Sequence, residues 1–192
     1  MTPSLVIMAG GRGLRLHPIT AHIPKPLIRV GSKPILEQII DEAKEQGITQ
    51  FFLCVHYKAD LIENYFGDGS DKGISIKYIH EPEPSGTAGA LAYLPPMDSP
   101  FIVRNADIIA DINYSDLMKA HEQHGGDATM CLALYQHQVP FGVVDVFDNM
   151  AVKIREKPIE NFQVNAGIYV LPPSALSHIS GGHCDMPDIL NE

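Results

Sequence analysis

Short apolar runs alternate with amphipathic stretches along most of the chain. A short apolar run bounded by turn residues predicts a buried strand, and apolar residues recurring three and four positions apart predict a helix. Strands are therefore predicted at Leu5–Ala9, Phe51–Val55, Ile74–Ile79, Phe101–Arg104, Ala128–Leu134 and Ala166–Leu171. Helices are predicted at Pro34–Gln46, Lys58–Phe66, Thr87–Leu94 and Tyr114–His124.

Strands that alternate with helices are typical of a largely parallel sheet covered on both faces. The pattern predicts an α/β fold, arranged as a Rossmann-like three-layer α/β/α structure with a mostly parallel mixed sheet. The region from Phe141 to Val170 differs, because it consists of short β segments joined by turns. We expect this region to form a small β-rich flap.

The chain has 192 residues, of which 45% are hydrophobic, and this suffices for the core of one domain. We expect residues 1–192 to form a single domain. The last residues, from Met186 onward, read as the first turn of another helix. For that reason we expect the domain to be incomplete at its C-terminus.

Acidic residues outnumber basic ones, 23 to 14, which gives a formal net charge of −9. This balance argues against a nucleic-acid-binding surface, which requires a basic stripe. The three cysteines are widely spaced, and no segment resembles a signal peptide or approaches the length of a membrane span. We expect a cytoplasmic protein that binds neither nucleic acid nor membrane. The sequence leaves the oligomeric state open, a homo-oligomer included.

Three segments with polar and glycine residues fall at or just after predicted strand ends: Gly10–Lys25, Glu81–Gly89 and Asn105–Asp111. In parallel α/β sheets, ligands bind beyond the carboxyl ends of the strands. The sequence therefore predicts that the three segments form one site.

The first of these segments has the composition of a phosphate-binding loop. Its glycines let backbone N–H groups approach phosphate oxygens without a Cβ in the way. Arg15 can donate two hydrogen bonds to phosphate, and Lys25 can supply a compact charge. Pro24 and Pro26 restrict the backbone on both sides of Lys25. A glycine-rich turn with surface cations is the alternative, although turn chemistry alone does not require these cations.

The stretch from Gly10 to Pro26 resembles the signature GGxGxRLxPxTxxxPKP of the nucleotidyltransferases that make sugar nucleotides. The resemblance implies that Arg15 and Lys25 are catalytic residues, which stabilise the leaving pyrophosphate and the reacting α-phosphate. Leu14 stands where that family usually has threonine. The related molybdenum-cofactor nucleotidyltransferases have a shorter signature and fit less well. The residues implied to bind the triphosphate are Ala9, Gly10, Gly11 and Gly13.

The stretch Val103–Asp107 ends a predicted strand with a carboxylate. The family has a similar Asn-Gly-Asp element there, which implies that Asp107 is a catalytic residue and the ligand of Mg²⁺, with Asn105 binding nucleotide. Ala106 replaces the common glycine. The alternative is that Asp107 only caps a helix; we expect Asp111 to cap the following helix.

The family supplies a second metal carboxylate from a Trp-Leu-Asp-like segment, and no equivalent precedes Glu192. Either the chain is incomplete, or Mg²⁺ is held by Asp107, substrate phosphates and water.

The stretch Glu81–Leu91 is expected to read the nucleotide base. Gly86 and Gly89 allow a flat base to lie against the backbone, and the Glu81 carboxylate can accept two parallel hydrogen bonds from guanine. Relatives that use GTP tend to carry this glutamate, followed by the Gly-Thr-Ala-Gly run that includes Thr87. We therefore favour GTP, with a solvated Glu81 and base reading by backbone alone as the alternative.

Later segments resemble the family's sugar-phosphate-binding elements. Val139–Val144 resembles its sugar-facing strand, where Gly142 allows close approach of a hexose. Glu156 and Lys157 match an element in which the glutamate accepts sugar hydroxyls and the lysine meets the sugar phosphate. Asn165 lies in the next sugar-contacting strand. None of the histidines is expected to be catalytic.

The resemblance implies that the protein transfers a nucleoside monophosphate, GMP favoured, from a nucleoside triphosphate to a sugar 1-phosphate. It is strongest toward bacterial glucosamine-1-phosphate or mannose-1-phosphate guanylyltransferases. The alternatives are an enzyme that uses UTP, dTTP or CTP, and a non-catalytic subunit that senses nucleotide sugars.

Overall fold

The computed structural model describes residues 2–125, 127–179 and 182–191. The chain divides into two compact units, one made of residues 1–130 and 167–192 and the other of residues 131–166. The first unit contains the predicted nucleotide segments, and the second contains the predicted flap. Whether the two units form one domain stays a prediction.

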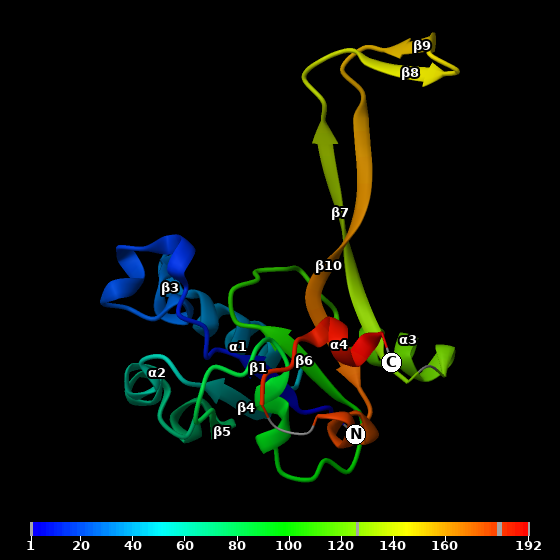
Figure 1. Cartoon of the computed structure of the whole chain (residues 1–192). Helices are drawn as coiled ribbons and strands as arrows, with labels where there is room; N and C mark the ends of the chain where they lie inside the picture. Colours follow the sequence, from blue (N-terminus) through cyan, green and yellow to red (C-terminus); the bar gives the residue numbers. More distant parts are fainter. Residues whose placement is uncertain (1, 126, 180–181, 192) are drawn as a thin grey trace. The chain divides into compact units, whose positions relative to one another are not determined.

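A six-stranded sheet is the centre of the fold, with the strand order β5-β4-β1-β6-β10-β7 (Figure 1). Strands β5, β4, β1 and β6 are parallel, and β10 is antiparallel to β6. The predicted mostly parallel mixed sheet is thus confirmed. The strands are β1 (Leu5–Met8), β4 (Gln50–Val55), β5 (Ser75–His80), β6 (Phe101–Asn105), β7 (Thr129–Gln138) and β10 (Ile159–Leu171).

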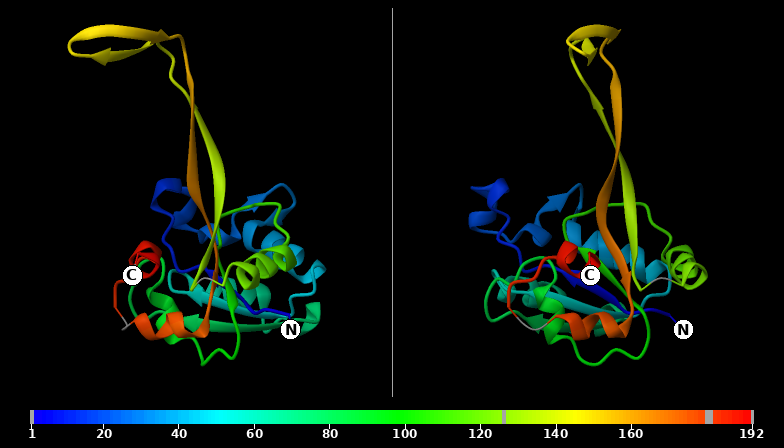
Figure 2. Two further views of the ribbon diagram at one scale, coloured as in Figure 1. Left: turned by 90° about the vertical axis from the view of Figure 1, so that its right-hand side faces the viewer. Right: turned by 45° about the vertical axis from the view of Figure 1, so that its right-hand side comes forward.

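Helices cover both faces of the sheet (Figure 2). On one face, Arg104 of β6 contacts Glu42 of α1 and Tyr114 of α3. On the other face, Val103 and its neighbours pack with three short helices in one hydrophobic cluster. The elements on the two faces are α1 (Ile35–Glu45) and α3 (Tyr114–His124), and the 3-10 helices η5 (Gly89–Tyr93) and η6 (Pro173–His178) with α4 (Met186–Leu190). This confirms the predicted three layers.

The remaining elements of the first unit are short or peripheral. Helix α2 and the 3-10 helix η4 precede β5, and a small two-stranded sheet of β2 and β3 precedes α1. Three 3-10 helices follow β1. These elements are α2 (Ala59–Phe66), η4 (Ser70–Lys72), β2 (Arg29–Val30), β3 (Lys33–Pro34), η1 (Leu14–Leu16), η2 (Ile19–Ala21) and η3 (Lys25–Leu27).

Two local predictions differ from the structure. The helix predicted at Thr87–Leu94 is present as the shorter 3-10 helix at Gly89–Tyr93, because Thr87 and Ala88 belong to a turn that is bound to Asp185 and to the Cys184 carbonyl. Asp111 does not cap α3; the Asn113 side chain accepts the hydrogen bond from the third residue of that helix instead.

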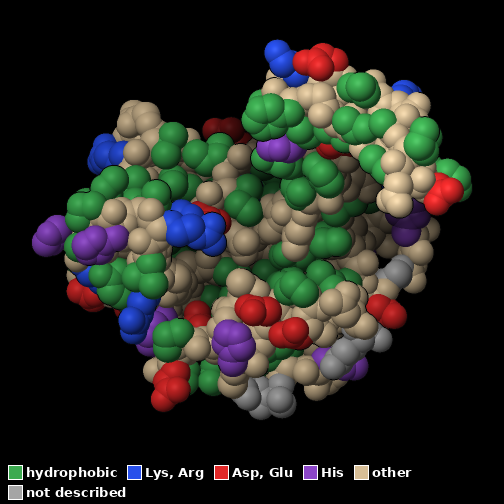
Figure 3. Space-filling model, turned by 45° about the horizontal axis from the view of Figure 1, so that its top comes forward, with side chains coloured by type: hydrophobic (Ala, Val, Ile, Leu, Met, Phe, Trp, Pro, Cys, Tyr) green, Lys and Arg blue, Asp and Glu red, His purple; other side chains and the backbone are tan. Residues whose placement is uncertain are grey.

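The second unit consists of β structure, as its sequence predicted. Strands β8 (Val143–Phe147) and β9 (Met150–Arg155) form an antiparallel ladder with an irregularity between Asp145 and Val146. Figure 3 shows hydrophobic side chains gathered at the surface of the molecule. The exposed ones in this unit include Phe141, Val146, Phe147, Met150, Val152 and Ile154.

Within the described residues, no helix combines the length and the apolar character that crossing a bilayer requires.

Candidate active site

A cavity of about 740 Å³ lies at the carboxyl ends of β1 and β6. All three segments predicted to form one site contribute to its lining, so the structure brings them together. The predicted residues that line it are Gly10, Gly11, Gly13, Arg15, Lys25, Glu81, Gly86, Thr87, Asn105 and Asp107. Ala9 is different: it is buried below the loop, where its N–H donates to the Cys54 carbonyl at 2.8 Å.

The glycine-rich loop is shaped by contacts that need two of its glycines. A Cβ on Gly10 would lie 2.4 Å from Oε1 of Glu81, and one on Gly13 would lie 2.9 Å from the Thr20 side chain. Gly13 also has φ +62°, which disfavours other residues. By contrast, a Cβ on Gly11 would meet nothing within 4 Å. The backbone at Gly11 is therefore open toward the cavity.

Lys25 and Asp107, 82 residues apart, form an ion pair at the edge of the cavity. Pro24 is extended and leads into η3, which begins at Lys25. Both side chains keep about a third of their surface exposed, 31% for Lys25 and 38% for Asp107. A cation and a carboxylate thus meet at the cavity, where Lys25 could contact a phosphate directly and Asp107 could do so only through a bound metal ion.

Glu81 lines the cavity but is already engaged within the chain. It is 8% exposed, and its Oε2 accepts hydrogen bonds from the N–H and the hydroxyl of Ser85, at 3.2 and 2.7 Å. Burial raises the pKa of the neighbouring Cys54 thiol, and the negative charge of Glu81 raises it further. One oxygen of Glu81 is therefore committed to the turn, and base reading by this residue stays a prediction.

The loop after Glu81 is fixed by the distant segment Cys184–Met186. The N–H and hydroxyl of Thr87 both donate to Oδ1 of Asp185, at 2.8 and 3.0 Å. The Thr87 hydroxyl in turn accepts the N–H of Met186 at 2.8 Å. A Cβ on Gly86 would lie 2.5 Å from the Cys184 carbonyl oxygen. The glycine expected to accommodate a base is thus also required for this contact.

Asn105 is held from the other side by Gly167. A Cβ on Gly167 would lie 2.6 Å from Nδ2 of Asn105 and 2.5 Å from the Ile108 side chain, and Gly167 has φ +66°. The N–H of Ala106 donates to the Met8 carbonyl at 3.1 Å. The loop that carries Asp107 is therefore packed on two neighbouring strands.

Asp107 offers one carboxylate to a hard divalent cation, and its Oδ2 is paired with Lys25 in the structure. Mg²⁺ prefers carboxylate and phosphate oxygens and uses one or two protein carboxylates. Among the side chains that the structure describes, no group of three or more His, Cys, Asp or Glu converges to hold an ion. Asp107 would accordingly be the protein ligand of a metal otherwise bound by substrate phosphates and water.

Sequence reasoning missed several residues of the cavity. Arg12, Ser85 and His183 also line it. Arg12 could have been found as a cation inside the glycine run, and Ser85 as a neighbour of Gly86. His183 carries no local signal, because it reaches the cavity only through the contacts of the Cys184–Met186 segment.

The four residues predicted to bind the sugar phosphate belong to the second unit or its border: Gly142, Glu156, Lys157 and Asn165. A Cβ on Gly142 would lie 3.1 Å from Oε2 of Glu156, so these two residues are neighbours. Lys157 has φ +44°, which turns the chain directly after Glu156. The sugar-binding roles of all four stay predictions.

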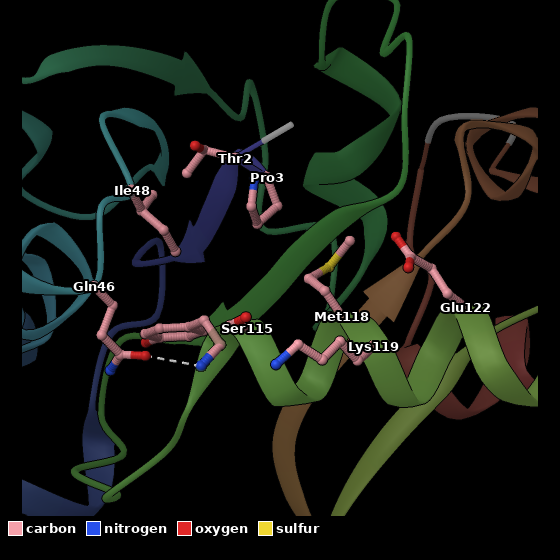
Figure 4. A pocket seen from close by; sticks show the side chains of 9 residues that line it. Thr2, Pro3, Gln46, Ile48, Ser115, Met118, Lys119 and Glu122 are labelled. Carbon is pink, nitrogen blue, oxygen red and sulfur yellow. Dashed lines mark hydrogen bonds between the residues drawn. The ribbon is translucent and has the colours of Figure 1, made fainter.

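A second cavity, of about 390 Å³, lies between the start of β1, the end of α1 and α3 (Figure 4). No predicted site residue lines it. Gln46, at its wall, has both ends of its amide bonded within the chain, to the Tyr114 N–H at 2.9 Å and the Ile112 carbonyl at 2.8 Å. The polar groups of the Gln46 side chain are therefore structural, and the first cavity remains the candidate site.

Comparisons with known proteins agree with this geometry. Residues 4–188 match the family model described as nucleotidyl transferase. The chain is 38% identical over 184 residues to a protein named probable mannose-1-phosphate guanylyltransferase 2 from Oryza sativa subsp. japonica, covering 91% of this chain and 51% of the relative. It is 36% identical over 182 residues to the mannose-1-phosphate guanylyltransferase catalytic subunit beta of Drosophila pseudoobscura pseudoobscura, covering 91% of this chain and 49% of that protein. The chain thus spans about half the length of the curated relatives it matches.

Solved structures give the same picture. HddC from Yersinia pseudotuberculosis superimposes with a TM-score of 0.74 at 26% identity, over 95% of this chain and 82% of HddC. A second HddC structure, in complex with GMP-PN, has a TM-score of 0.73 at 25% identity, with the same coverage of both chains. The fold alone is shared with a putative glucose-1-phosphate thymidylyltransferase from Bacillus anthracis, with a TM-score of 0.76 at 24% identity, over 98% of this chain and 81% of the other. The family match over nearly the whole chain shows that this protein belongs to the nucleotidyl transferase family.

Proposed function

We propose that this protein transfers GMP from GTP to a sugar 1-phosphate and releases pyrophosphate. The observation that carries the proposal is the Lys25–Asp107 pair at the edge of a cavity lined by the glycine-rich loop. A site that only had to hold a phosphate would not need a carboxylate beside the cation.

The proposed chemistry is a direct displacement. A phosphate oxygen of the sugar 1-phosphate forms a bond to the α-phosphorus of the nucleotide, and the bond from that phosphorus to the bridging oxygen of pyrophosphate breaks. Because the attacking oxygen is already anionic, no general base is needed. The protein therefore contributes positioning and charge neutralisation.

Each part of the site has a distinct task in this proposal. Backbone N–H groups at Gly11 and Gly13 receive the triphosphate, and Arg15 neutralises the departing pyrophosphate. Lys25 stabilises the charge that develops at the α-phosphate. Asp107 would hold Mg²⁺, which supplies further neutralisation of the phosphates when bound.

The choice of substrates rests on two supports. GTP is favoured by Glu81 and by the guanylyltransferase names of the relatives. Those names also favour mannose 1-phosphate over glucosamine 1-phosphate as the sugar substrate. We assign the sugar contacts to Gly142, Glu156, Lys157 and Asn165.

The test is product formation measured by mass spectrometry, with Mg²⁺, all common nucleoside triphosphates and a panel of hexose and hexosamine 1-phosphates. GDP-mannose is the expected product. A UDP- or dTDP-sugar would retain the reaction and overturn the assignment of the base. Binding of GDP-mannose without any turnover would favour the sensor of nucleotide sugars instead.

A further inference from the structure

Arg104 is a buried charge that the proposed chemistry does not use. It is the fourth residue of β6, directly before Asn105, and its side chain is fully buried. An arginine at such a position must be paired, because a desolvated guanidinium without partners is strongly unfavourable. Its partners therefore show what the residue holds together.

The guanidinium of Arg104 joins three elements of the first unit. One terminal nitrogen donates to Oε2 of Glu42 in α1 at 3.2 Å and to the hydroxyl of Tyr114 at the start of α3. The other donates to the backbone carbonyl of Ile108 at 2.8 Å. Ile108 directly follows Asp107. The two ends of the loop Asn105–Asp107 are thus tied to each other by one side chain.

Tyr114 is itself fixed in place. Its N–H donates to Oε1 of Gln46 at the end of α1, at 2.9 Å. Tyr114 as a whole is 2% exposed. The Arg104 side chain is therefore anchored to two helices before it reaches the loop, and it has little freedom to follow a movement of Ile108.

Stability gives no sufficient reason for this arrangement. Apolar side chains of similar volume often replace a buried ion pair without loss of stability. Here Nε of Arg104 and Oε1 of Glu42 are buried and have no hydrogen-bond partner among the described residues, so the cluster is not fully satisfied there. An apolar cluster would also fill the space, but it could not hold the Ile108 carbonyl.

We propose that Arg104 is a positioning residue that sets the direction of the Asp107 carboxylate for binding a divalent cation. The proposal rests on the proposed function only in so far as Asp107 is the metal ligand. It does not require that the chain turns over.

The test uses Mn²⁺ as the probe, titrated by electron paramagnetic resonance in the presence of a non-hydrolysable GTP analogue. Four proteins are compared: the wild type, Asp107→Ala, the triple variant Arg104→Met/Glu42→Leu/Tyr114→Phe, and the combination of both changes. The triple variant leaves no buried charge unpaired. The matched control is Lys119→Met/Asp116→Leu, which removes an exposed ion pair within α3.

We expect the triple variant to remain folded in thermal unfolding and to bind Mn²⁺ about 10-fold more weakly. Asp107→Ala should lower the Mn²⁺ affinity at least as much. The combined variant should bind Mn²⁺ no more weakly than Asp107→Ala alone, because the effects of substitutions at coupled residues are not additive. The control should bind like the wild type. Affinity for the GTP analogue without metal should stay unchanged in the triple variant, which separates positioning from general disruption.

The proposal would be overturned if the triple variant bound Mn²⁺ with wild-type affinity. Strictly additive losses of Mn²⁺ affinity in the combined variant would also overturn it, as would Mn²⁺ binding that Asp107→Ala does not change. If the triple variant fails to fold, the single variant Tyr114→Phe is tested in its place, and its Mn²⁺ affinity is expected to fall about 2-fold to 5-fold. A wild-type chain that binds Mn²⁺ through Asp107 but forms no product would refute the proposed function and leave this proposal standing. Product formation by the wild type, together with strictly additive losses of Mn²⁺ affinity in the variants, would support the proposed function and refute the positioning role of Arg104.

Discussion

The two units hold their candidate binding residues in different ways. In the first unit, the residues around the cavity are tied down by contacts from elements far away in sequence, such as Lys25 to Asp107 and Thr87 to Asp185. In the second unit, Glu156 and Lys157 lie exposed at the end of β9, and the regular contacts there are those of the β8–β9 ladder.

This difference indicates which candidate binding residues are preorganised before a ligand binds. The side predicted to bind phosphate is partly preorganised, because Lys25 and Asp107 are already paired with each other. The residues predicted to bind the sugar phosphate include the exposed Glu156 and Lys157, whose side chains have more rotamer freedom to lose on binding. We therefore expect substitutions in the first unit to affect nucleotide binding and turnover, and substitutions in the second to affect the sugar substrate alone.

The largest effect is expected from Lys25→Ala. Removal of a cation placed at the reacting phosphate should lower kcat/KM by about 100-fold to 1,000-fold, or about 2.7–4 kcal/mol. Steady-state kinetics with GTP and mannose 1-phosphate measures it. Lys33→Ala, which removes an exposed lysine outside the cavity, is the matched control. A Lys25→Ala enzyme of near-native kcat/KM would disprove the assignment.

A second comparison lies within the glycine-rich loop. Gly10→Ala places a methyl group against the Glu81 carboxylate, whereas Gly11→Ala meets open space. We expect Gly10→Ala to lower the free energy of unfolding by about 1–3 kcal/mol through overpacking, and Gly11→Ala to leave it nearly unchanged. Chemical denaturation of both proteins checks this. Equal stability of the two variants would mean that Glu81 moves aside freely.

The division between the units is tested by Lys157→Ala. Loss of one charged contact to the sugar phosphate should raise the KM for mannose 1-phosphate about 10-fold, equivalent to about 1.4 kcal/mol. The dissociation constant of GTP, measured by calorimetry, should not change. Lys153→Ala, on β9 without a predicted sugar contact, is the control. If GTP affinity falls with Lys157→Ala, the proposed division of labour is wrong.

The smallest effect is expected at Asp185. Asp185→Ala removes the acceptor for two hydrogen bonds from Thr87 and should weaken GTP binding about 3-fold to 10-fold. Asp185→Asn keeps an acceptor oxygen and should bind almost normally. Asp188→Ala is the control in α4, because it removes only the acceptor of the Asp185 N–H.

The same contact has a defined pH dependence. The hydrogen bonds from the Thr87 N–H and hydroxyl lower the pKa of Asp185 below its ordinary value of about 3.9. Because the pKa of Asp185 is lower in the folded state, its ionised carboxylate contributes fully to stability at any pH above the ordinary pKa. This contribution is lost only as the pH falls through the folded-state pKa. GTP affinity should therefore not depend on Asp185 ionisation near neutral pH. A titration of Asp185 near pH 7, followed by NMR, would contradict this.

Local pattern predicted most of the fold and the outline of the site. Strand runs and the rule that ligands bind beyond strand ends were enough to bring Lys25 and Asp107 to one edge. Arg104 was not recognised, because its role depends on which residues of α1 and α3 lie beside β6. No local pattern in the sequence shows such contacts between distant segments.

The contacts of the Cys184–Met186 segment could not be predicted for a related reason. They join side chains to backbone groups across about half the chain, where neither spacing nor composition gives a signal. The same contacts explain why the helix predicted at Thr87–Leu94 is shorter in the structure. Its apolar spacing is helical, but Thr87 and Ala88 belong to a turn that is bound to Asp185 and Cys184.

The contact between Thr87 and Asp185 spans 98 residues, and this has a consequence for synthesis on the ribosome. Contacts that are distant in sequence form slowly, because a long loop must close first. The segments that carry Lys25 and Asp107 are complete long before residue 185 is made. The wall of the cavity that is predicted to contact the base is therefore expected to be assembled last, so a nascent chain would acquire its predicted phosphate-binding half before it could distinguish one nucleotide from another.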